Sequence, residues 1–436
     1  MGDLLELSSV QYLAGSRSGP LSGEIEVPGD KSMSHRAVIL GALAHGETRI
    51  TGLLESDDVL HTVEAIRAFG AEVDREASCR WIVRGTDWQS PGTPIDCGNS
   101  GTGARLMMGA AAAFPIKVTF TGDSSLSSRP MERVTAPLRA MGARTEGTAL
   151  PVTIRGGKLR GIRFVNEKAS AQVKSAILLA GLGADGAVEV VEPRPSRDHS
   201  ENMLRAFGCD VHDSGGVVRL GARRELRGTD VLIPGDPSSA AFPMVAALIV
   251  PESCVTVRNV MVNPLRAGLF KTLREMGADI VTTNRRLQGG EEVAELTVTS
   301  SRLRGIEVPA ERAPSMIDEY VILAVAAAFA DGRTVMHGVA ELRVKESDRL
   351  AAIVSGLQAC GVEAREDGDT LVVEGVGGAP AGGAQVKARG DHRVAMSFLV
   401  MGLGTQRPVT VDSAGMIATS FPDFVPAMRS LGAEIE

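Results

Sequence analysis

The sequence is poor in aromatic residues, and it has no apolar run long enough to cross a membrane. Its 436 residues include 2 Trp, 2 Tyr and 11 Phe, so the cores must be mainly aliphatic. The longest apolar stretches, such as 320–330, are well short of the roughly 20 residues that a membrane helix needs. The amino-terminal segment lacks the basic and apolar regions of a secretory signal. We therefore expect a cytoplasmic protein with no membrane partner.

Cysteine and positive charge are also scarce. The 5 cysteines, at 79, 97, 209, 254 and 360, contain no C-x-x-C pair, which indicates reduced thiols rather than disulfides or a zinc site. Lys and Arg number 46 against 53 Asp and Glu, and the resulting net charge of -7 opposes binding to nucleic acid. Any anion site must therefore be a local cluster of cations, and we expect no metal and no nucleic-acid partner.

What the chain has in abundance is a repeated phrase that contains glycine. Each copy follows an amphipathic stretch and precedes strand-like residues, so we predict a left-handed glycine at the end of a helix in every copy. The repeat unit is about 70 residues long. The six copies are AFGAEVD, AMGARTE, AFGCDVH, EMGADIV, ACGVEAR and SLGAEIE, with glycines at 70, 142, 208, 277, 361 and 432.

A second series of six segments is apolar on nearly all sides and rich in small residues. Helices of this composition lie inside a domain rather than on its surface. With the β-rich runs between them, they predict six units, each with strands, one buried helix and one amphipathic helix. The six segments are 33–44, 101–114, 170–182, 238–250, 318–330 and 391–403.

The chain also divides into two matching halves of three units each. VPGDKSMSHRAVILGALA, from Val27, is echoed by IPGDPSSAAFPMVAALIV, from Ile233. We expect these two phrases to mark crossovers between domains. One domain would be 29–235 and the other, which is discontinuous, 1–28 plus 236–436, and the cleft between them would be the natural ligand site.

Several buried helices are predicted to begin with residues that attract anions. Free backbone N–H groups at a helix start, together with nearby Lys and Arg side chains, favour the binding of phosphate or carboxylate. The Ser and Asp residues at these helix starts also suit ordinary helix capping. Together these starts and the nearby loops supply enough cations for two small, multiply charged acids. The cations are Lys31, Arg36, Arg105, Arg129, Arg197, Lys345, Arg349 and Arg393.

Three other segments carry patterns that are also found at functional sites. For the first two, a purely structural interpretation stays open beside the functional one. For the third, the functional interpretation is excluded. Asp318, before an apolar helix, is either a base or a favourable charge at a helix start. The alternating charges of 342–350 are usually the mark of a solvated helix face, although they also suit a site. The phrase at 181–186 matches G-x-G-x-x-G, but it follows a helix and precedes a strand, so we predict a turn and no dinucleotide site.

Eight phrases occur in order along the chain: PGDKSMSHRA, GNSGTGARL, SSRPMERV, SAQVKSA, PSMIDEY, LRVKESDR, DHRVAMS and IATSFPDF. Together they resemble the 5-enolpyruvylshikimate-3-phosphate (EPSP) synthases in their bacterial class II form, over residues 20–436. The resemblance implies a two-domain inside-out α/β barrel of six βαββαβ-type units. It also implies an enzyme of the shikimate pathway that moves the carboxyvinyl group of phosphoenolpyruvate to the 5-hydroxyl of shikimate-3-phosphate, without a cofactor or metal.

The resemblance implies roles for individual residues. Asp318 would take the proton from the 5-hydroxyl, and Glu346, with Lys31 nearby, would handle proton transfer at the methylene carbon. Shikimate-3-phosphate would contact Lys31, Ser32, Arg36, Ser170, Ala171, Gln172, Arg197, Asp318 and Lys345. Phosphoenolpyruvate would contact Lys31, Gly101, Arg129, Gln172, Arg349 and Arg393.

The sequence departs from many members of this family near its end. They have a lysine before the T-F-P-D-type phrase, whereas here Ala418, Thr419 and Ser420 stand there, so we expect no phosphoenolpyruvate contact from that segment. By the same resemblance, glyphosate would compete with phosphoenolpyruvate near Gly101, and the protein would be a monomer.

Two alternative functions fit the sequence less well. UDP-N-acetylglucosamine enolpyruvyl transferase shares the fold and the donor, but its reactive loop carries a cysteine, and residues 122–128 here have none. A repeat scaffold without catalytic activity would need an exposed recognition surface, whereas the cations here stand at helix starts beside acids.

Overall fold

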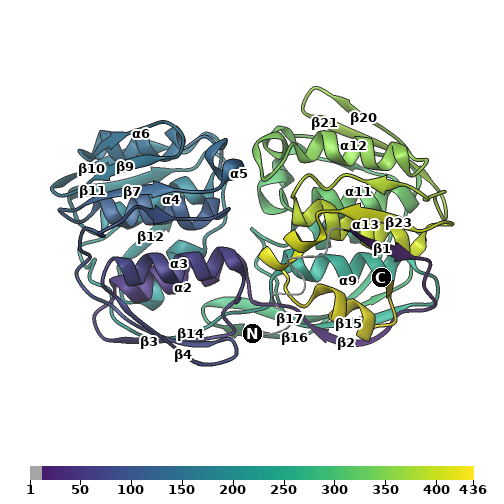
Figure 1. The fold of residues 1–436 in the computed structure, drawn as a ribbon, viewed down its shortest axis with the longest axis horizontal. Coiled ribbons are helices and arrows are strands. Elements are labelled where there is room, and N and C mark those ends of the chain that lie inside the picture. The colour runs from purple at the N-terminus through teal and green to yellow at the C-terminus, as the bar shows by residue number, and fades with distance from the viewer. Residues whose placement is uncertain (1–11) are drawn as a thin grey trace. The chain divides into compact units, whose positions relative to one another are not determined.

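The computed structural model describes residues 12–436, and none of the helices in this range is long and apolar enough to span a bilayer. Contacts divide the chain into two compact units, which are drawn in Figure 1. Of the described residues, unit 1 comprises 12–28, Gly235–Arg286 and Glu292–Glu436. Unit 2 comprises Gly29–Pro234 and the short segment Leu287–Glu291, which the sequence analysis did not separate from its surroundings.

Within residues 12–436, six four-stranded sheets share one topology. In each, a parallel pair lies at one edge, and the second strand of that pair is antiparallel to the third. The sheets of unit 2 are β14 (Asp230–Leu232), β3 (Glu47–Thr51), β5 (Arg80–Arg84), β4 (Glu72–Ala77); β6 (Ile95–Asp96), β7 (Lys117–Thr121), β9 (Val152–Arg155), β8 (Arg144–Glu146); and β10 (Leu159–Val165), β11 (Ala184–Val191), β13 (Val217–Leu220), β12 (Val211–Ser214).

The remaining three sheets repeat this order and confirm the predicted α/β fold of six similar units. They belong to unit 1, apart from the end of β16 and the first residue of β17. These sheets are β16 (Asp279–Gln288), β17 (Glu291–Thr299), β15 (Cys254–Met261), β2 (Ser22–Glu26); β18 (Glu307–Val308), β19 (Asp331–Met336), β21 (Thr370–Val376), β20 (Glu363–Asp367); and β22 (Gln385–Val386), β23 (Val409–Asp412), β1 (Tyr12–Ser16), β24 (Glu434–Ile435).

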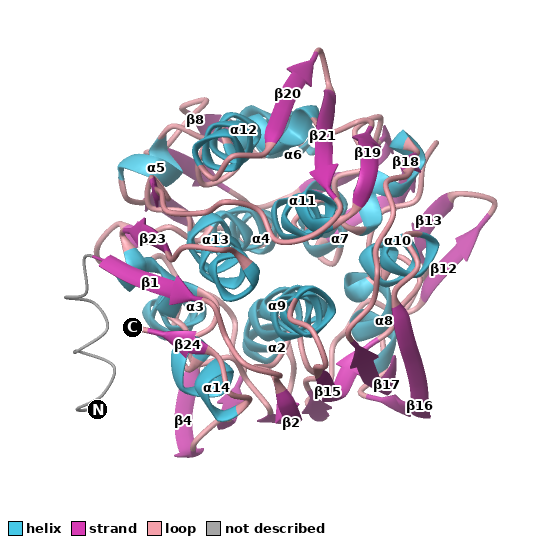
Figure 2. Ribbon diagram, turned by 90° about the vertical axis from the view of Figure 1, so that its right-hand side faces the viewer, coloured by secondary structure: helices cyan, strands magenta, loops and turns pink. Residues whose placement is uncertain are grey.

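Six helices form the interior of the units, as their composition predicts. Figure 2 shows three of them, α9, α11 and α13, end-on, with the strands of unit 1 around them. Small residues on these helices allow close packing, and nearly every side chain on them is buried. The buried helices are α2 (Lys31–Leu43), α4 (Gly101–Ala112), α7 (Ala171–Gly181), α9 (Pro237–Ile249), α11 (Tyr320–Phe329) and α13 (His392–Gly404).

Six amphipathic helices cover this interior, and all six predicted glycines follow them. The glycines at 70, 142, 208, 277, 361 and 432 have φ between 82° and 111°, so the prediction of left-handed helix ends is confirmed. The helices are α3 (Asp57–Ala68), α6 (Glu132–Met141), α8 (His199–Ala206), α10 (Gly268–Glu275), α12 (Arg349–Ala359) and α14 (Phe424–Ser430).

A side chain from the last turn of each outer helix holds the residues that follow the glycine. In four repeats an arginine donates to the main-chain oxygen six residues further on, and a glutamine does so in a fifth. In the sixth, Arg139 donates to the Thr145 hydroxyl. The carbonyl pairs are Arg67 with Val73, Arg205 with Val211, Arg274 with Ile280, Gln358 with Ala364, and Arg429 with Ile435.

In the described part of the chain, four short helices lie in the segments just before longer helices. They are α5 (Ser124–Ser127), η1 (Ala310–Ser315), η2 (Ala340–Val344) and η3 (Ala414–Thr419).

Candidate active site

The predicted site residues of unit 2 lie mainly at the starts of its buried helices. Asp30 caps α2 by accepting the Met33 N–H at 2.8 Å, so the capping interpretation is correct for this residue. Lys31 is the first residue of α2 and forms an ion pair with Asp58, which is buried on α3. The lysine of the GDKS phrase is therefore fixed by a carboxylate from another segment.

The start of α4 carries two guanidinium groups close to its backbone. A Cβ placed on Gly101 would lie 3.1 Å from Arg105 Nη1 and 3.2 Å from Arg129 Nη1. Arg129 also donates to Asn99 Oδ1 at 2.5 Å. Because Gly101 has no side chain, a small anion can approach both arginines and the free N–H groups of this helix end. Arg105 is one of the cations named in the sequence analysis, but no contact with either substrate is predicted for it.

Gln172 joins this group from α7. It accepts from Arg105 Nη1 at 2.6 Å and donates to the Thr102 hydroxyl at 2.8 Å. Ser170, the residue before Ala171 and Gln172, caps α7 at Val173 N and is held in turn by Asn166. The structure thus brings the start of α7 next to the start of α4, although about 70 residues separate them in the chain.

Arg36 lies one turn into α2 and is almost completely buried. Its Nη1 donates to the Ser32 carbonyl at 2.8 Å, so two of the predicted residues are in contact. Burial lowers the pKa of Arg36 to about 10, an effect that Asp30 opposes and the nearby charge of Arg197 reinforces. The charges of Glu201 and Glu291 also act on Arg36, in the same direction as Asp30, so its surroundings are of mixed charge.

In unit 1 a buried arginine is surrounded by three acids. Arg349 Nε donates to Asp391 at 2.8 Å, Nη1 lies 3.4 Å from Asp318, and Nη2 lies 2.6 Å from Glu346. Lys345 Nζ also contacts Asp318, at 3.1 Å. Burial opposes the charge of Arg349, but Asp391, Glu346 and Asp318 together hold its pKa above the ordinary value.

The charged phrase before α12 is not a helix face. Between the end of η2 at Val344 and the start of α12 at Arg349, the chain is irregular, and this allows Lys345 and Glu346 to point to the acid–arginine cluster. Asp348 caps α12 by accepting the Ala351 N–H at 3.1 Å. The alternative of a solvated helix face is therefore wrong for this segment.

Arg393 differs from Arg349, the arginine at the centre of the cluster. It is 9% exposed, and its main-chain N–H donates to Asp391 Oδ1 at 2.9 Å. Within residues 12–436, its guanidinium makes no hydrogen bond or ion pair. A guanidinium that is nearly buried and lacks a protein acceptor is suited to an anionic ligand.

The segment that lacks the family lysine is neutral in the structure. Thr419 Oγ1 lies 3.2 Å from His392 Nδ1, and Ser420 is buried. Sequence reasoning missed the roles of Asp58, Arg105 and Asp391. The only signal for Asp391 was its place before a helix, which predicts a cap and says nothing about Arg349.

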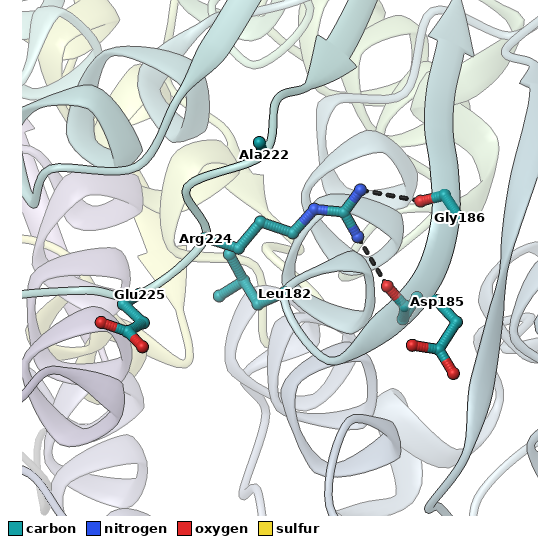
Figure 3. A pocket seen from close by; sticks show the side chains of 7 residues that line it. Leu182, Asp185, Gly186, Ala222, Arg224 and Glu225 are labelled. Carbon is teal, nitrogen blue, oxygen red and sulfur yellow. Dashed lines mark hydrogen bonds between the residues drawn. The ribbon is translucent and has the colours of Figure 1, made fainter.

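A surface hollow of about 360 Å³ lies at the glycine-rich turn after α7 and contains none of the predicted site residues (Figure 3). Arg224 crosses it and donates to the carbonyl oxygens of Ala184 and Gly186, each at 2.7 Å. The turn joins Gly181, the last residue of α7, to the first residue of β11. The prediction of a turn is correct for residues 182–183 and wrong for 184–186, which already belong to β11.

Among the residues that the structure describes, one group in unit 2 has ligand atoms close enough for a metal ion. Asp198, His199 and Glu291 place one such atom each within 4.8 Å of the others. His199 Nδ1 already lies 2.9 Å from Glu291 Oε1, and Glu291 interacts with the positive charge of Arg36. A second cation beside Arg36 would be repelled, so we assign no metal to this group.

The comparisons with known proteins agree on one family. The family model described as EPSP synthase (3-phosphoshikimate 1-carboxyvinyltransferase) matches residues 16–428. A relative named 3-phosphoshikimate 1-carboxyvinyltransferase from Caulobacter vibrioides is 57% identical, over 97% of this chain and 99% of its own. One of the same name from Phenylobacterium zucineum is 56% identical, over 97% of this chain and 96% of its own.

Solved structures match along nearly the whole chain. The EPSP synthase from Acinetobacter baumannii has a TM-score of 0.87 and 42% identity, with 98% of this chain and 99% of that chain covered. The enolpyruvyl transferase NikO from Streptomyces tendae, at a TM-score of 0.80 and 21% identity over 98% of each chain, shares the fold. The chain therefore belongs to the EPSP synthase (3-phosphoshikimate 1-carboxyvinyltransferase) family.

Proposed function

We propose that the protein transfers the carboxyvinyl group of phosphoenolpyruvate to the 5-hydroxyl of shikimate-3-phosphate and releases phosphate. Family membership supports this reaction. The observation that carries the chemistry is the cluster in unit 1, where Asp318 and Glu346 share Arg349, and the nearly buried Arg393 has no acceptor from the described part of the chain. The cluster combines proton-transfer groups with a guanidinium available to an anion.

Asp318 is the base in this proposal. Its carboxylate contacts Lys345 and Arg349, two cations that stabilise the ionised form, which can accept the proton of the 5-hydroxyl. As the proton leaves, the hydroxyl oxygen attacks the substituted carbon of phosphoenolpyruvate. Lys345 also serves the phosphate of shikimate-3-phosphate.

Glu346 completes the addition by proton transfer to the methylene carbon, with Lys31 as the second group proposed for this step. The product of addition is a tetrahedral adduct that carries both phosphate groups. Elimination returns a proton from the former methylene carbon and expels phosphate, which restores the double bond. Fixed cations favour this step because negative charge moves to the leaving phosphate.

The remaining cations and helix starts bind the two substrates. Shikimate-3-phosphate is held in unit 2 by residues at the starts of α2, α7 and α8, and phosphoenolpyruvate by residues around the start of α4 and in the unit 1 cluster. The first set is Lys31, Ser32, Arg36, Ser170, Ala171, Gln172 and Arg197. The second set is Lys31, Gly101, Arg129, Gln172, Arg349 and Arg393.

The function is tested by measuring phosphate release from phosphoenolpyruvate with shikimate-3-phosphate or UDP-N-acetylglucosamine as the acceptor. We expect release with the first acceptor only. Release with the second would instead support the UDP-N-acetylglucosamine enolpyruvyl transferase, and binding without release would support a scaffold. Inhibition by glyphosate, a monomeric state, a cytoplasmic location and independence from cofactors stay predictions.

A further inference from the structure

The guanidinium of Arg36 donates three hydrogen bonds to the protein and keeps two N–H groups for a ligand. Nε donates to Ser200 Oγ at 2.7 Å, Nη2 to Ser175 Oγ at 2.8 Å, and Nη1 to the Ser32 carbonyl at 2.8 Å. A guanidinium has five N–H groups. Three are therefore occupied, and one on each Nη atom remains without an acceptor among the residues that the structure describes. Two such N–H groups match the two oxygens of a carboxylate or phosphate.

The proton positions of the two serines follow from their contacts. Ser175 Oγ lies 2.6 Å from the Ala171 carbonyl, which can only accept, so the Ser175 hydroxyl donates there. Ser175 Oγ and Ser200 Oγ are also 2.6 Å apart, so Ser200 donates to Ser175. Both serine oxygens then accept from Arg36. The two hydroxyls thus connect Arg36 on α2 with α8 and with the first turn of α7.

These acceptors orient the guanidinium without neutralising it. Ser175 and Ser200 are 1% and 4% exposed, and neither carries charge. Arg349 provides a contrast within the same chain, because its N–H groups face the carboxylates of Asp391, Asp318 and Glu346. The N–H groups of Arg349 thus face carboxylates, whereas those of Arg36 bind neutral oxygens. Asp30, Glu201 and Glu291 act on the charge of Arg36, but within residues 12–436 none of them accepts a hydrogen bond from it.

We propose that Ser175 and Ser200 are positioning residues that hold the two remaining N–H groups of Arg36 toward an anionic group of shikimate-3-phosphate. This proposal rests on the proposed function and adds two residues that make no contact with substrate themselves. Loss of either hydroxyl leaves Arg36 able to rotate and removes one hydrogen bond to a charged group. The consequence falls on the binding of shikimate-3-phosphate.

The test uses Ser200→Ala and Ser175→Ala in the full-length protein. We expect a roughly tenfold or larger increase in the Kd and KM for shikimate-3-phosphate, the size associated with a lost hydrogen bond to a charged group. The KM for phosphoenolpyruvate should change much less. Because the hydroxyls are bonded to each other, the double variant should lose less affinity than the product of the single effects.

Ser397→Ala is the matched control. Ser397 is a fully buried serine on α13 whose hydroxyl has no hydrogen-bond partner among residues 12–436, so its removal should leave all constants unchanged. Ser200→Thr restores a hydroxyl and should recover most of the affinity. This variant keeps the proposal testable even if an alanine variant fails to fold.

The possible outcomes separate the two proposals. If the wild type neither binds shikimate-3-phosphate nor releases phosphate, the proposed function is wrong. If the wild type is active, the positioning role is overturned by alanine variants with normal affinity for shikimate-3-phosphate. It is also overturned by equal losses of affinity for both substrates, or by a threonine variant that folds and binds no better than alanine.

Discussion

Asp391 performs two tasks that substitution can separate. Its carboxylate is fully buried and accepts from Arg349 Nε at 2.8 Å and Nη2 at 3.3 Å. The same group caps α13 through the main-chain N–H groups of Arg393 and Val394, at 2.9 and 3.4 Å. Asp391→Asn keeps an oxygen for the cap and removes the charge, whereas Asp391→Ala removes both.

The size of each effect can be worked out from these contacts. Breaking a buried ion pair by removing one partner costs roughly 3 to 5 kcal/mol. Arg349 keeps Glu346 and Asp318 as partners, so we expect a smaller cost for Asp391→Asn, about 2 to 3 kcal/mol in the free energy of unfolding. Asp391→Ala should cost about 1 kcal/mol more, because the cap is lost as well.

Denaturant unfolding of the two variants and the wild type measures both differences. Asp348 supplies the control, since it caps α12 but is partly exposed, and its ion pair with Arg343 is at the surface. Asp348→Asn should change the free energy of unfolding by less than about 1 kcal/mol. If Asp391→Asn is as stable as the wild type, or Asp391→Ala no less stable than Asp391→Asn, the reasoning is refuted.

Three other predictions follow from the site. Asp318→Asn and Glu346→Gln should each bind both substrates and turn over roughly 10²-fold more slowly, because proton transfer is lost; steady-state rates near those of the wild type would contradict the assigned roles. Gly101→Ala puts a methyl group 3.1 to 3.2 Å from two guanidinium groups. The ratio of the inhibition constant of glyphosate to the KM for phosphoenolpyruvate should rise, since glyphosate is the longer ligand, and an unchanged ratio would argue against the idea. Burial keeps the pKa of His35 well below its ordinary value. Below about pH 6.5 the imidazole of His35 therefore binds a proton in the unfolded chain but stays neutral in the folded chain. Because the unfolded chain binds more protons, the free energy of unfolding falls as the pH is lowered, by at most about 1.4 kcal/mol per pH unit. His35→Gln should show a smaller decrease between about pH 7 and 5 in the free energy of unfolding, and equal slopes would count against this assignment.

The sequence alone determined the features that depend on neighbours in the chain. Gly70 and the five equivalent glycines end helices because only the local backbone decides whether a left-handed residue is needed. The buried helices follow from small apolar residues on all sides, and Asp30 caps α2 because its acceptor group is three residues from the N–H that it binds. Motif resemblance added the family, which the comparisons confirm.

Tertiary structure alone decided which charged groups meet. Asp391 and Arg349 are 42 residues apart, and Ser175 is 139 residues from Arg36, so no local pattern links them. The same aspartate that the sequence identifies as a cap also becomes the counterion of a buried arginine once α12 and α13 pack together. Burial then sets the strength of each pair, because the cost of removing a charge from water depends on everything packed around it.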